Sequence, residues 1–152
     1  MPAYITKSKG TVYGTPTWIL DKYLPATYKD VAPHPFQPEI WNGLTMDWAE
    51  TPNVNYCNPP FQDLARKWAD VIKNESLKGK LICLLMPART SSNYTREKLL
   101  PYCKHIVFLP KVKFIDYEDK CETKSVCPAA IILMYFNYKP ENLEVMDCTM
   151  SL

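Results

Sequence analysis

Glycine is scarce in this sequence: its 152 residues include only 4 glycines but 14 prolines. Phosphate-binding loops need several closely spaced glycines, so this composition argues against such a loop. The prolines predict a chain with many stiff corners. The 6 cysteines form no Cys-x-x-Cys pair, and the 2 histidines lie far apart. The spacing therefore does not support a structural zinc site, and we expect no bound metal.

Long apolar stretches are also missing. The longest, residues 128–136, is much shorter than the roughly 20 residues that a membrane helix needs. The first residues, Met-Pro-Ala-Tyr-Ile-Thr-Lys, lack the apolar core of a secretory signal. We therefore expect a soluble protein without membrane contact, in the reducing environment of the cytoplasm.

Neither sign of charge dominates. The net charge is +2 and the isoelectric point is near 8.1, well short of the strongly basic balance of a dedicated nucleic-acid binder. This balance permits a nucleic-acid partner without requiring one. The hydrophobic content of 47% is typical of a globular protein with one core. We expect a single domain over residues 1–152, with an irregular lead-in at 1–14 and a tail at 137–152.

The most distinctive segment of the chain runs from Val54 to Phe61 and reads Val-Asn-Tyr-Cys-Asn-Pro-Pro-Phe. Its first residues suit a strand, and Pro59 and Pro60 end that strand, because proline has no N–H and holds φ at about −65°. Asn58 and the adjacent carbonyl groups then form a stiff, acceptor-rich turn beside the flat ring of Phe61. Such a turn suits a planar substrate that carries an amino group. The alternative is an ordinary strand-to-helix turn in which a proline begins the helix.

A helix and a second strand follow this turn. Apolar residues recur at helical spacing over residues 61–72, with charged residues on the other side, and Gly79 is expected to end the segment. Residues 81–86 read Leu-Ile-Cys-Leu-Leu-Met and are apolar on both faces, as in a central strand of a parallel sheet. Strand, helix and strand together predict a βαβ unit.

Weaker patterns complete the expected fold. Thr15 is a candidate N-cap for a short helix that begins at Pro16 and turns Trp18 toward the core. The other expected elements are strands at residues 28–32, 105–109, 111–114 and 128–136, a helix at 94–103, and a polar loop at 116–125. Alternating strands and helices predict an α/β fold, a three-layer Rossmann-like domain with a mainly parallel, mixed sheet.

Three polar residues should meet at the carboxyl ends of the parallel strands, where open α/β sheets bind their ligands. Asp30 ends the strand at 28–32, where its carboxylate could accept hydrogen bonds from a ribose or an amino group, or simply cap a turn. Asn58 ends the next strand. Arg89 follows the strand at 81–86 and could bind a phosphate or a carboxylate, or be an ordinary solvated arginine. One cleft at this edge could hold both a cofactor and a flat base.

Over residues 15–136 the chain resembles the phage-type DNA adenine methyltransferases, a branch of the S-adenosylmethionine-dependent amino-methyltransferases. The resemblance is carried by an ordered series of motifs: Thr15-Pro16-Thr17-Trp18, Asp30-Val31-Ala32-Pro33, Asn42-Gly43-Leu44 followed by Trp48, Tyr56-Cys57-Asn58-Pro59-Pro60-Phe61, Leu84-Leu85-Met86-Pro87-Ala88-Arg89-Thr90 and Lys111-Val112-Lys113-Phe114.

This resemblance implies methyl transfer from S-adenosylmethionine to the N6 amino group of adenine in double-stranded DNA. Asn58 and the carbonyl of Pro59 would accept the two N–H hydrogens of that amino group, on the stiff turn that Pro60 completes. Phe61 would stack on the base, which must be flipped out of the duplex. The residues expected at the cofactor are Thr15, Pro16, Trp18, Asp30 and Asn42, the last standing where related sequences generally have an acidic residue. Those expected at the substrate are Arg89, Lys111 and Lys113.

Two other functions remain open at this point. One is a methyltransferase that acts on an amide or amine of protein or RNA. The other is a catalytically inactive protein that keeps the fold and binds DNA or a partner. With no room for a separate target-recognition domain, DNA sequence choice would come from loops such as 116–125, from a second copy in a homodimer, or from another protein. The resemblance also implies a phage or viral origin, and hence the host cell cytoplasm.

Overall fold

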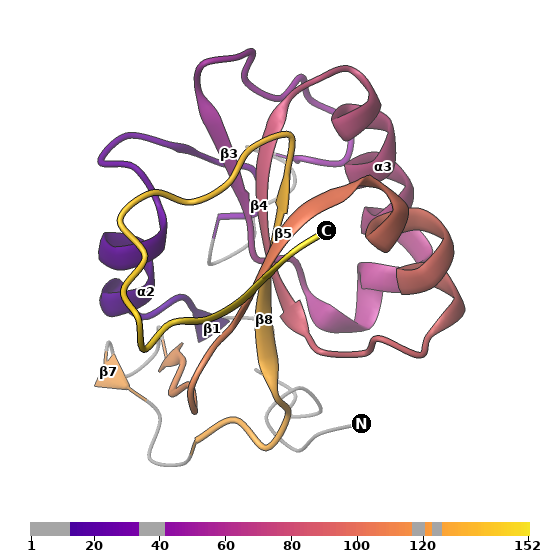
Figure 1. Ribbon diagram of the computed structural model, residues 1–152. Coiled ribbons are helices and arrows are strands. Elements are labelled where there is room, and N and C mark those ends of the chain that lie inside the picture. The colour runs from indigo at the N-terminus through magenta and orange to yellow at the C-terminus, as the bar shows by residue number, and fades with distance from the viewer. Residues whose placement is uncertain (1–12, 34–41, 117–120, 123–125) are drawn as a thin grey trace.

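A six-stranded sheet forms the centre of the structure (Figure 1). The computed structural model describes residues 13–33, 42–116, 121–122 and 126–152. The strands of the sheet lie in the order β2 (Lys29–Asp30), β3 (Val54–Cys57), β4 (Leu81–Pro87), β8 (Ile131–Phe136), β5 (Cys103–Phe108) and β9 (Cys148–Ser151). The strands expected near residues 28–32, 54–57, 81–86, 105–109 and 128–136 are thus confirmed, with bounds shifted by a few residues.

The sheet is mixed, as expected, but the prediction that it is mainly parallel is wrong. Strands β2, β3 and β4 pair in parallel, whereas β8 is antiparallel to both β4 and β5, and β9 is antiparallel to β5. The sequence pattern suggested that β5 lies beside β4 as the next parallel strand. Instead β8, all of whose residues are buried, lies between them, since a strand that is apolar on both faces is most stable inside a sheet.

The connection from β3 to β4 is the expected strand–helix–strand unit. It consists of the 3-10 turn η1 (Phe61–Asp63), the π-helical turn η2 (Leu64–Trp68) and the helix α3 (Ala69–Leu77). Gly79 has a φ of 85°, a left-handed conformation that glycine adopts easily and that ends the helical segment. β3 and β4 therefore run in parallel, and their carboxyl ends lie at the same edge of the sheet.

Both faces of the sheet are covered, because successive side chains of a strand point to opposite faces. Leu84 of β4 belongs to the buried cluster beneath η2 and α3, together with Trp68. Its neighbour Leu85 belongs to a second cluster on the other face, with Ile19 of the helix α2 (Thr17–Tyr23). Figure 1 shows α2 and α3 on opposite sides of the sheet.

The outer parts of the chain follow the expectations only in part. Residues 94–103 contain two short helical turns, η3 (Thr95–Leu99) and η4 (Leu100–Tyr102), where one helix was expected. The tail at 137–152 carries the edge strand β9, which was not predicted. A small second sheet joins β1 (Tyr13–Gly14), β6 (Ile115–Asp116) and β7 (Cys121–Glu122). The rest of the polar loop expected at 116–125 lies outside the described residues.

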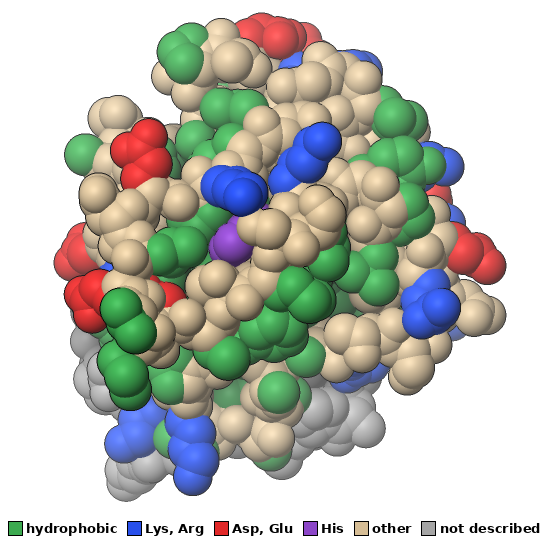
Figure 2. Space-filling view, in the orientation of Figure 1, with side chains coloured by type: hydrophobic (Ala, Val, Ile, Leu, Met, Phe, Trp, Pro, Cys, Tyr) green, Lys and Arg blue, Asp and Glu red, His purple; other side chains and the backbone are tan. Residues whose placement is uncertain are grey.

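The surface and the cysteines agree with a globular chain. Cys57 and Cys83 are buried and free. On the face that carries β9, hydrophobic side chains lie among scattered Lys and Arg side chains (Figure 2), and Met150 of β9 is one of the exposed apolar residues. In the described ranges, no helix is both long enough and apolar enough to cross a membrane.

Candidate functional site

Three parallel strands bring the expected polar residues to one edge of the sheet. Asp30, the last residue of β2, is paired with Tyr56 of β3. Asn58 directly follows β3, and Arg89 lies in the loop just after β4. Because these strands run in the same direction, all three residues lie at their carboxyl ends. The expectation that they share an edge is confirmed, and we call this edge the carboxyl edge.

The Asn58 side chain is held by a threonine that is distant in sequence. Asn58 is only 3% exposed, and its amide nitrogen Nδ2 donates a hydrogen bond of 3.1 Å to Oγ1 of Thr15. The same Thr15 oxygen forms a hydrogen bond with the hydroxyl of Tyr56. Buried polar groups are rarely left without partners, and Asn58, Thr15 and Tyr56 are joined by these two hydrogen bonds.

Thr15 therefore does not cap the helix, and that prediction is wrong. The N-cap position of α2 is Pro16, which has an extended ψ of 146°, and the helix makes no side-chain capping bond. A capping hydroxyl would have to point at the first N–H groups of the helix. The hydroxyl of Thr15 instead points at Asn58 and Tyr56, two side chains that are buried from water.

Tyr56 is a buried phenol in the middle of this arrangement. Its ring packs edge-on against Tyr28, with ring centroids 5.8 Å apart. Burial raises the pKa of Tyr56 well above its usual value of 10.0, and the negative charge of Asp30 adds to that effect. Burial likewise raises the pKa of the Cys57 thiol. At neutral pH the site therefore contains a protonated phenol and a protonated thiol, with no thiolate nucleophile at Cys57.

The two prolines have different environments. Pro59 is buried, whereas Pro60 is half-buried. Pro60 has a φ of −56° as the N-cap of η1, and its carbonyl accepts a hydrogen bond of 3.0 Å from the N–H of Asp63. Pro60 thus begins the helical segment, as expected for an ordinary strand-to-helix turn in which a proline begins the helix. Of the two proline carbonyls, that of Pro59 is the one that takes no part in starting the helix.

An aromatic pair lies beside this turn. The half-buried ring of Phe61 meets the ring of Phe114 edge-on, with centroids 6.1 Å apart and an angle of 73° between the ring planes. Phe114 and Val112 are buried, and Lys111 and Lys113 are exposed. This alternation was expected, but residues 111–114 form no described strand; Cys127 donates one backbone bond of 2.7 Å to Val112.

The two lysines approach the same edge as Asn58. β5 points in the same direction as β4, because both are antiparallel to β8, and residues 109–114 follow the end of β5. The backbone N–H groups of Ala88 and Leu109 bond to the carbonyls of Ala130 and Ile131 at the start of β8. The segment with Lys111 and Lys113 therefore leaves the sheet close to the loop with the exposed Arg89.

The other residues expected at the cofactor make local contacts. Pro16 is buried, and Trp18 is half-buried against the cluster under α2. Asp30 Oδ1 accepts a hydrogen bond of 3.0 Å from the N–H of Ala32, and Asn42 Oδ1 accepts one of 3.0 Å from Leu44. Each of these two oxygens stabilises a turn of its own backbone, as Asp and Asn often do.

The turn at residues 42–45 packs directly on the end of β2. A Cβ atom added to Gly43 would lie 1.9 Å from the carbonyl oxygen of Val31, so only glycine fits there. The indole nitrogen of Trp48 donates a hydrogen bond of 2.7 Å to the carbonyl of Gly43 and holds the turn in place. This packing brings Asn42 close to the end of the strand that carries Asp30.

The described residues form two cavities away from the carboxyl edge and no candidate metal site. One cavity of about 440 Å³ is lined by Val54 and Leu81, the first residues of β3 and β4. A second of about 530 Å³ is lined by Gly79 and Tyr102. Both lie at the end of the sheet opposite to Asn58. Among the described residues, no group of three or more His, Cys, Asp or Glu side chains could hold a metal ion.

Sequence reasoning missed the aromatic residues around the turn: Tyr28, Tyr56 and Phe114. A signal existed for two of them. Tyr56 stands two residues before Asn58, so both side chains leave the strand on the same side. Phe114 alternates with two lysines, which indicated that it points inward. That Phe114 would meet Phe61, however, was not visible in either segment alone.

Comparison with protein families gives a match over nearly the whole chain. The family model described as DNA N-6-adenine-methyltransferase (Dam) matches residues 2–151, which is nearly the whole chain and includes every residue of the carboxyl edge. No curated protein and no solved structure matches the chain.

Proposed function

Because the chain belongs to the DNA N-6-adenine-methyltransferase (Dam) family, we propose that it methylates the exocyclic amino group of adenine in DNA. S-adenosylmethionine supplies an electrophilic methyl group when bound. One observation carries the proposal: the buried Asn58, at the end of a parallel strand, has its amide nitrogen bonded to Thr15. The coverage of the sheet on both faces supports a Rossmann-like arrangement for this activity.

The groups at the carboxyl edge fit this cofactor chemically. The half-buried carboxylate of Asp30 is an acceptor for ribose hydroxyls or an ammonium group. The half-buried Trp18 offers apolar surface at the start of α2, next to the buried Pro16, and the Asn42 turn lies against the end of β2. We assign the cofactor to these residues and to Thr15, with Asp30 as the carboxylate of the set.

The Asn58–Phe61 turn would hold the acceptor. The Asn58 oxygen Oδ1 and the Pro59 carbonyl accept the two N–H hydrogens of the adenine amino group. This turns the nitrogen lone pair toward the methyl donor and stabilises the positive charge that grows on nitrogen. Phe61, supported by Phe114, stacks on the base, which has to leave the duplex to reach the site.

The protonation of the site favours direct transfer to the nitrogen. A covalent route would need a thiolate at Cys57, but burial raises the pKa of that thiol and keeps it protonated.

The DNA backbone is held by the exposed cations Arg89, Lys111 and Lys113. They bind the phosphates beside the flipped base, a contact that positions DNA without reading its sequence.

The test is transfer of a radiolabelled methyl group from S-adenosylmethionine to DNA, RNA and protein in parallel, followed by identification of the methylated atom. We expect label on N6 of adenine in DNA. Label on an amide or amine of protein or RNA would replace this function with another transfer. No label, with no calorimetric binding of S-adenosylmethionine at millimolar concentration, would indicate an inactive protein.

The Asn58→Ala variant tests the assignment of the acceptor turn. We expect the transfer rate to fall by about 10²–10³-fold, the effect of removing one preorganised polar group from a transition state. Binding of S-adenosylmethionine should change little, since Asn58 faces the acceptor. Asn74→Ala, which changes an exposed residue of α3, is the matched control. Full activity of Asn58→Ala would remove Asn58 from the reaction.

A further inference from the structure

An asparagine amide can work as the acceptor in this reaction only in one of two orientations. Its two ends have nearly the same shape, but one is an acceptor and the other a donor. Rotation of Asn58 by 180° would present N–H groups to the N–H groups of the substrate, which is repulsive. Some group on the protein must therefore decide which end of the amide faces the substrate.

Thr15 is the residue that contacts the amide nitrogen. The bond from Asn58 Nδ2 to Thr15 Oγ1 is 3.1 Å long, and it fixes the nitrogen on the side of α2. A hydroxyl can accept or donate, so Thr15 alone would tolerate both orientations of the amide. The choice depends on where the single hydrogen of the Thr15 hydroxyl goes.

Tyr56 is the residue that can accept the hydrogen of the Thr15 hydroxyl. Its hydroxyl forms a hydrogen bond with Thr15 Oγ1, and the residue is only 2% exposed, so water does not compete for this bond. When Thr15 gives its hydrogen to Tyr56, it has only lone pairs to offer to Asn58. Those lone pairs select the NH₂ end of the amide, and Oδ1 is then turned the other way.

We propose that Thr15 and Tyr56 are positioning residues that set the orientation of the Asn58 amide for methyl transfer. The inference rests on the proposed function of Asn58 as acceptor. In this role Thr15 positions the Asn58 amide in addition to contacting the cofactor. It also links the segment that begins α2 to the turn that holds the adenine amino group.

The experiment compares Thr15→Val, Thr15→Ser and Tyr56→Phe in the full chain, with saturating S-adenosylmethionine and double-stranded DNA of mixed sequence. Valine keeps the shape of threonine without the hydroxyl, so we expect kcat to fall by about tenfold or more while KM for DNA stays nearly constant. Serine restores the hydroxyl and should restore kcat. Tyr56→Phe keeps the ring against Tyr28 and should cause a smaller loss.

Thr51→Val is the matched control, because the Thr51 hydroxyl donates a bond of 3.3 Å to the Gly79 carbonyl at the opposite edge of the sheet. It should leave kcat unchanged. A kcat for Thr15→Val equal to wild type, or a loss explained wholly by weaker binding of S-adenosylmethionine, would overturn the inference. A loss in Thr15→Ser as large as in Thr15→Val would also overturn it.

A second measurement does not depend on activity. In nuclear magnetic resonance spectra, the Asn58 side-chain NH₂ protons should exchange slowly with water in wild type and faster in Thr15→Val and Tyr56→Phe. Equal exchange in all three proteins contradicts the positioning role. If wild type transfers no methyl group to any acceptor, the proposed function fails, and the exchange rates still decide whether Thr15 and Tyr56 hold the amide.

Discussion

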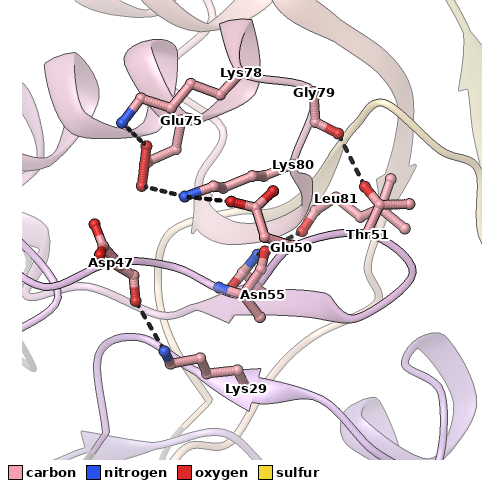
Figure 3. A network of polar contacts seen from close by, with 11 residues as sticks. Lys29, Asp47, Glu50, Thr51, Asn55, Glu75, Lys78, Gly79, Lys80 and Leu81 are labelled. Carbon is pink, nitrogen blue, oxygen red and sulfur yellow. Dashed lines mark hydrogen bonds and ion pairs between the residues drawn. The ribbon is translucent and has the colours of Figure 1, made fainter.

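The buried ion pair at the start of β4 gives a sharp test of how this fold is stabilised (Figure 3). The Lys80 ammonium lies 3.1 Å from Glu75 Oε1, and the two side chains are 5% and 7% exposed. The other Glu75 oxygen lies 2.8 Å from the ammonium of Lys78, which is 61% exposed. Glu75 therefore bonds to one buried and one exposed lysine. Glu50, 80% exposed, contributes a longer contact of 3.7 Å to Lys80.

We predict that Lys80→Met strongly destabilises the protein. Breaking a buried ion pair from one side costs about 3–5 kcal/mol, because the remaining charge stays buried. Glu75 keeps its bond to Lys78, so the lower end, about 3 kcal/mol, applies here. In a chain of this size, a loss of that order lowers the melting temperature by about 6–12 °C.

Thermal and urea unfolding of three further variants complete the test. Lys78→Met removes the same side chain from the same partner at an exposed site, where ion pairs contribute little, so its melting temperature should fall far less. The double variant Glu75→Leu/Lys80→Met replaces the pair with apolar side chains and should recover most of the loss. Glu75→Leu alone completes the double-mutant cycle.

The stability that Glu75 contributes depends on pH with a definite sign. Burial by itself would raise the pKa of Glu75, but hydrogen bonds from Lys78 and Lys80 outweigh it and leave the pKa below its ordinary value of 4.5. A carboxyl group with a lowered pKa stabilises the fold above that ordinary value, and the contribution is lost as the pH falls through the lowered pKa. The difference in unfolding free energy between wild type and Lys80→Met should therefore shrink below pH 4.5. Equal stability of Lys78→Met and Lys80→Met at neutral pH would refute this reasoning.

Two further predictions concern the carboxyl edge. Gly43→Ala should lower stability by about 1–3 kcal/mol, the usual cost of overpacking, because its Cβ would lie 1.9 Å from the Val31 carbonyl where at least 3.0 Å is needed. Calorimetry should also show weaker binding of S-adenosylmethionine, since the end of β2 must move; unchanged melting and binding would contradict the close contact. Lys111→Gln/Lys113→Gln should reduce the slope of log affinity for DNA against log salt by about 2. An unchanged slope would exclude contacts of these lysines with phosphates.

Much of the candidate site could be predicted because its residues follow from local chemistry. Two prolines must end the strand that begins at Val54, so the sequence alone predicts Asn58 at a strand end. Arg89 was expected at the same edge because strands joined through a helix run in parallel, and Asp30 because the sheet was expected to be mainly parallel. The parallel pairing of β2, β3 and β4 confirms the shared edge.

The partners of Asn58 and Phe61 could not be found in the same way. Thr15 is 43 residues from Asn58, and its local sequence indicated a helix cap. The contact exists because α2 packs on the face of the sheet to which Tyr56 and Asn58 point. Phe114 meets Phe61 for a similar reason, since β5 carries residues 109–114 to the end of the sheet where β8 begins.

The sequence by itself determined the main strands β3, β4, β5 and β8, the helical segment between β3 and β4, and where the Asn58–Phe61 turn stands. The spacing of apolar residues contains that information. Only the tertiary structure decided that β8 lies between β4 and β5, that β9 forms the outer strand, and that Thr15 holds Asn58. The backbone groups of every strand are alike as hydrogen-bonding partners. The choice among neighbours therefore depends on how well all the buried surfaces fit together, which no single segment contains.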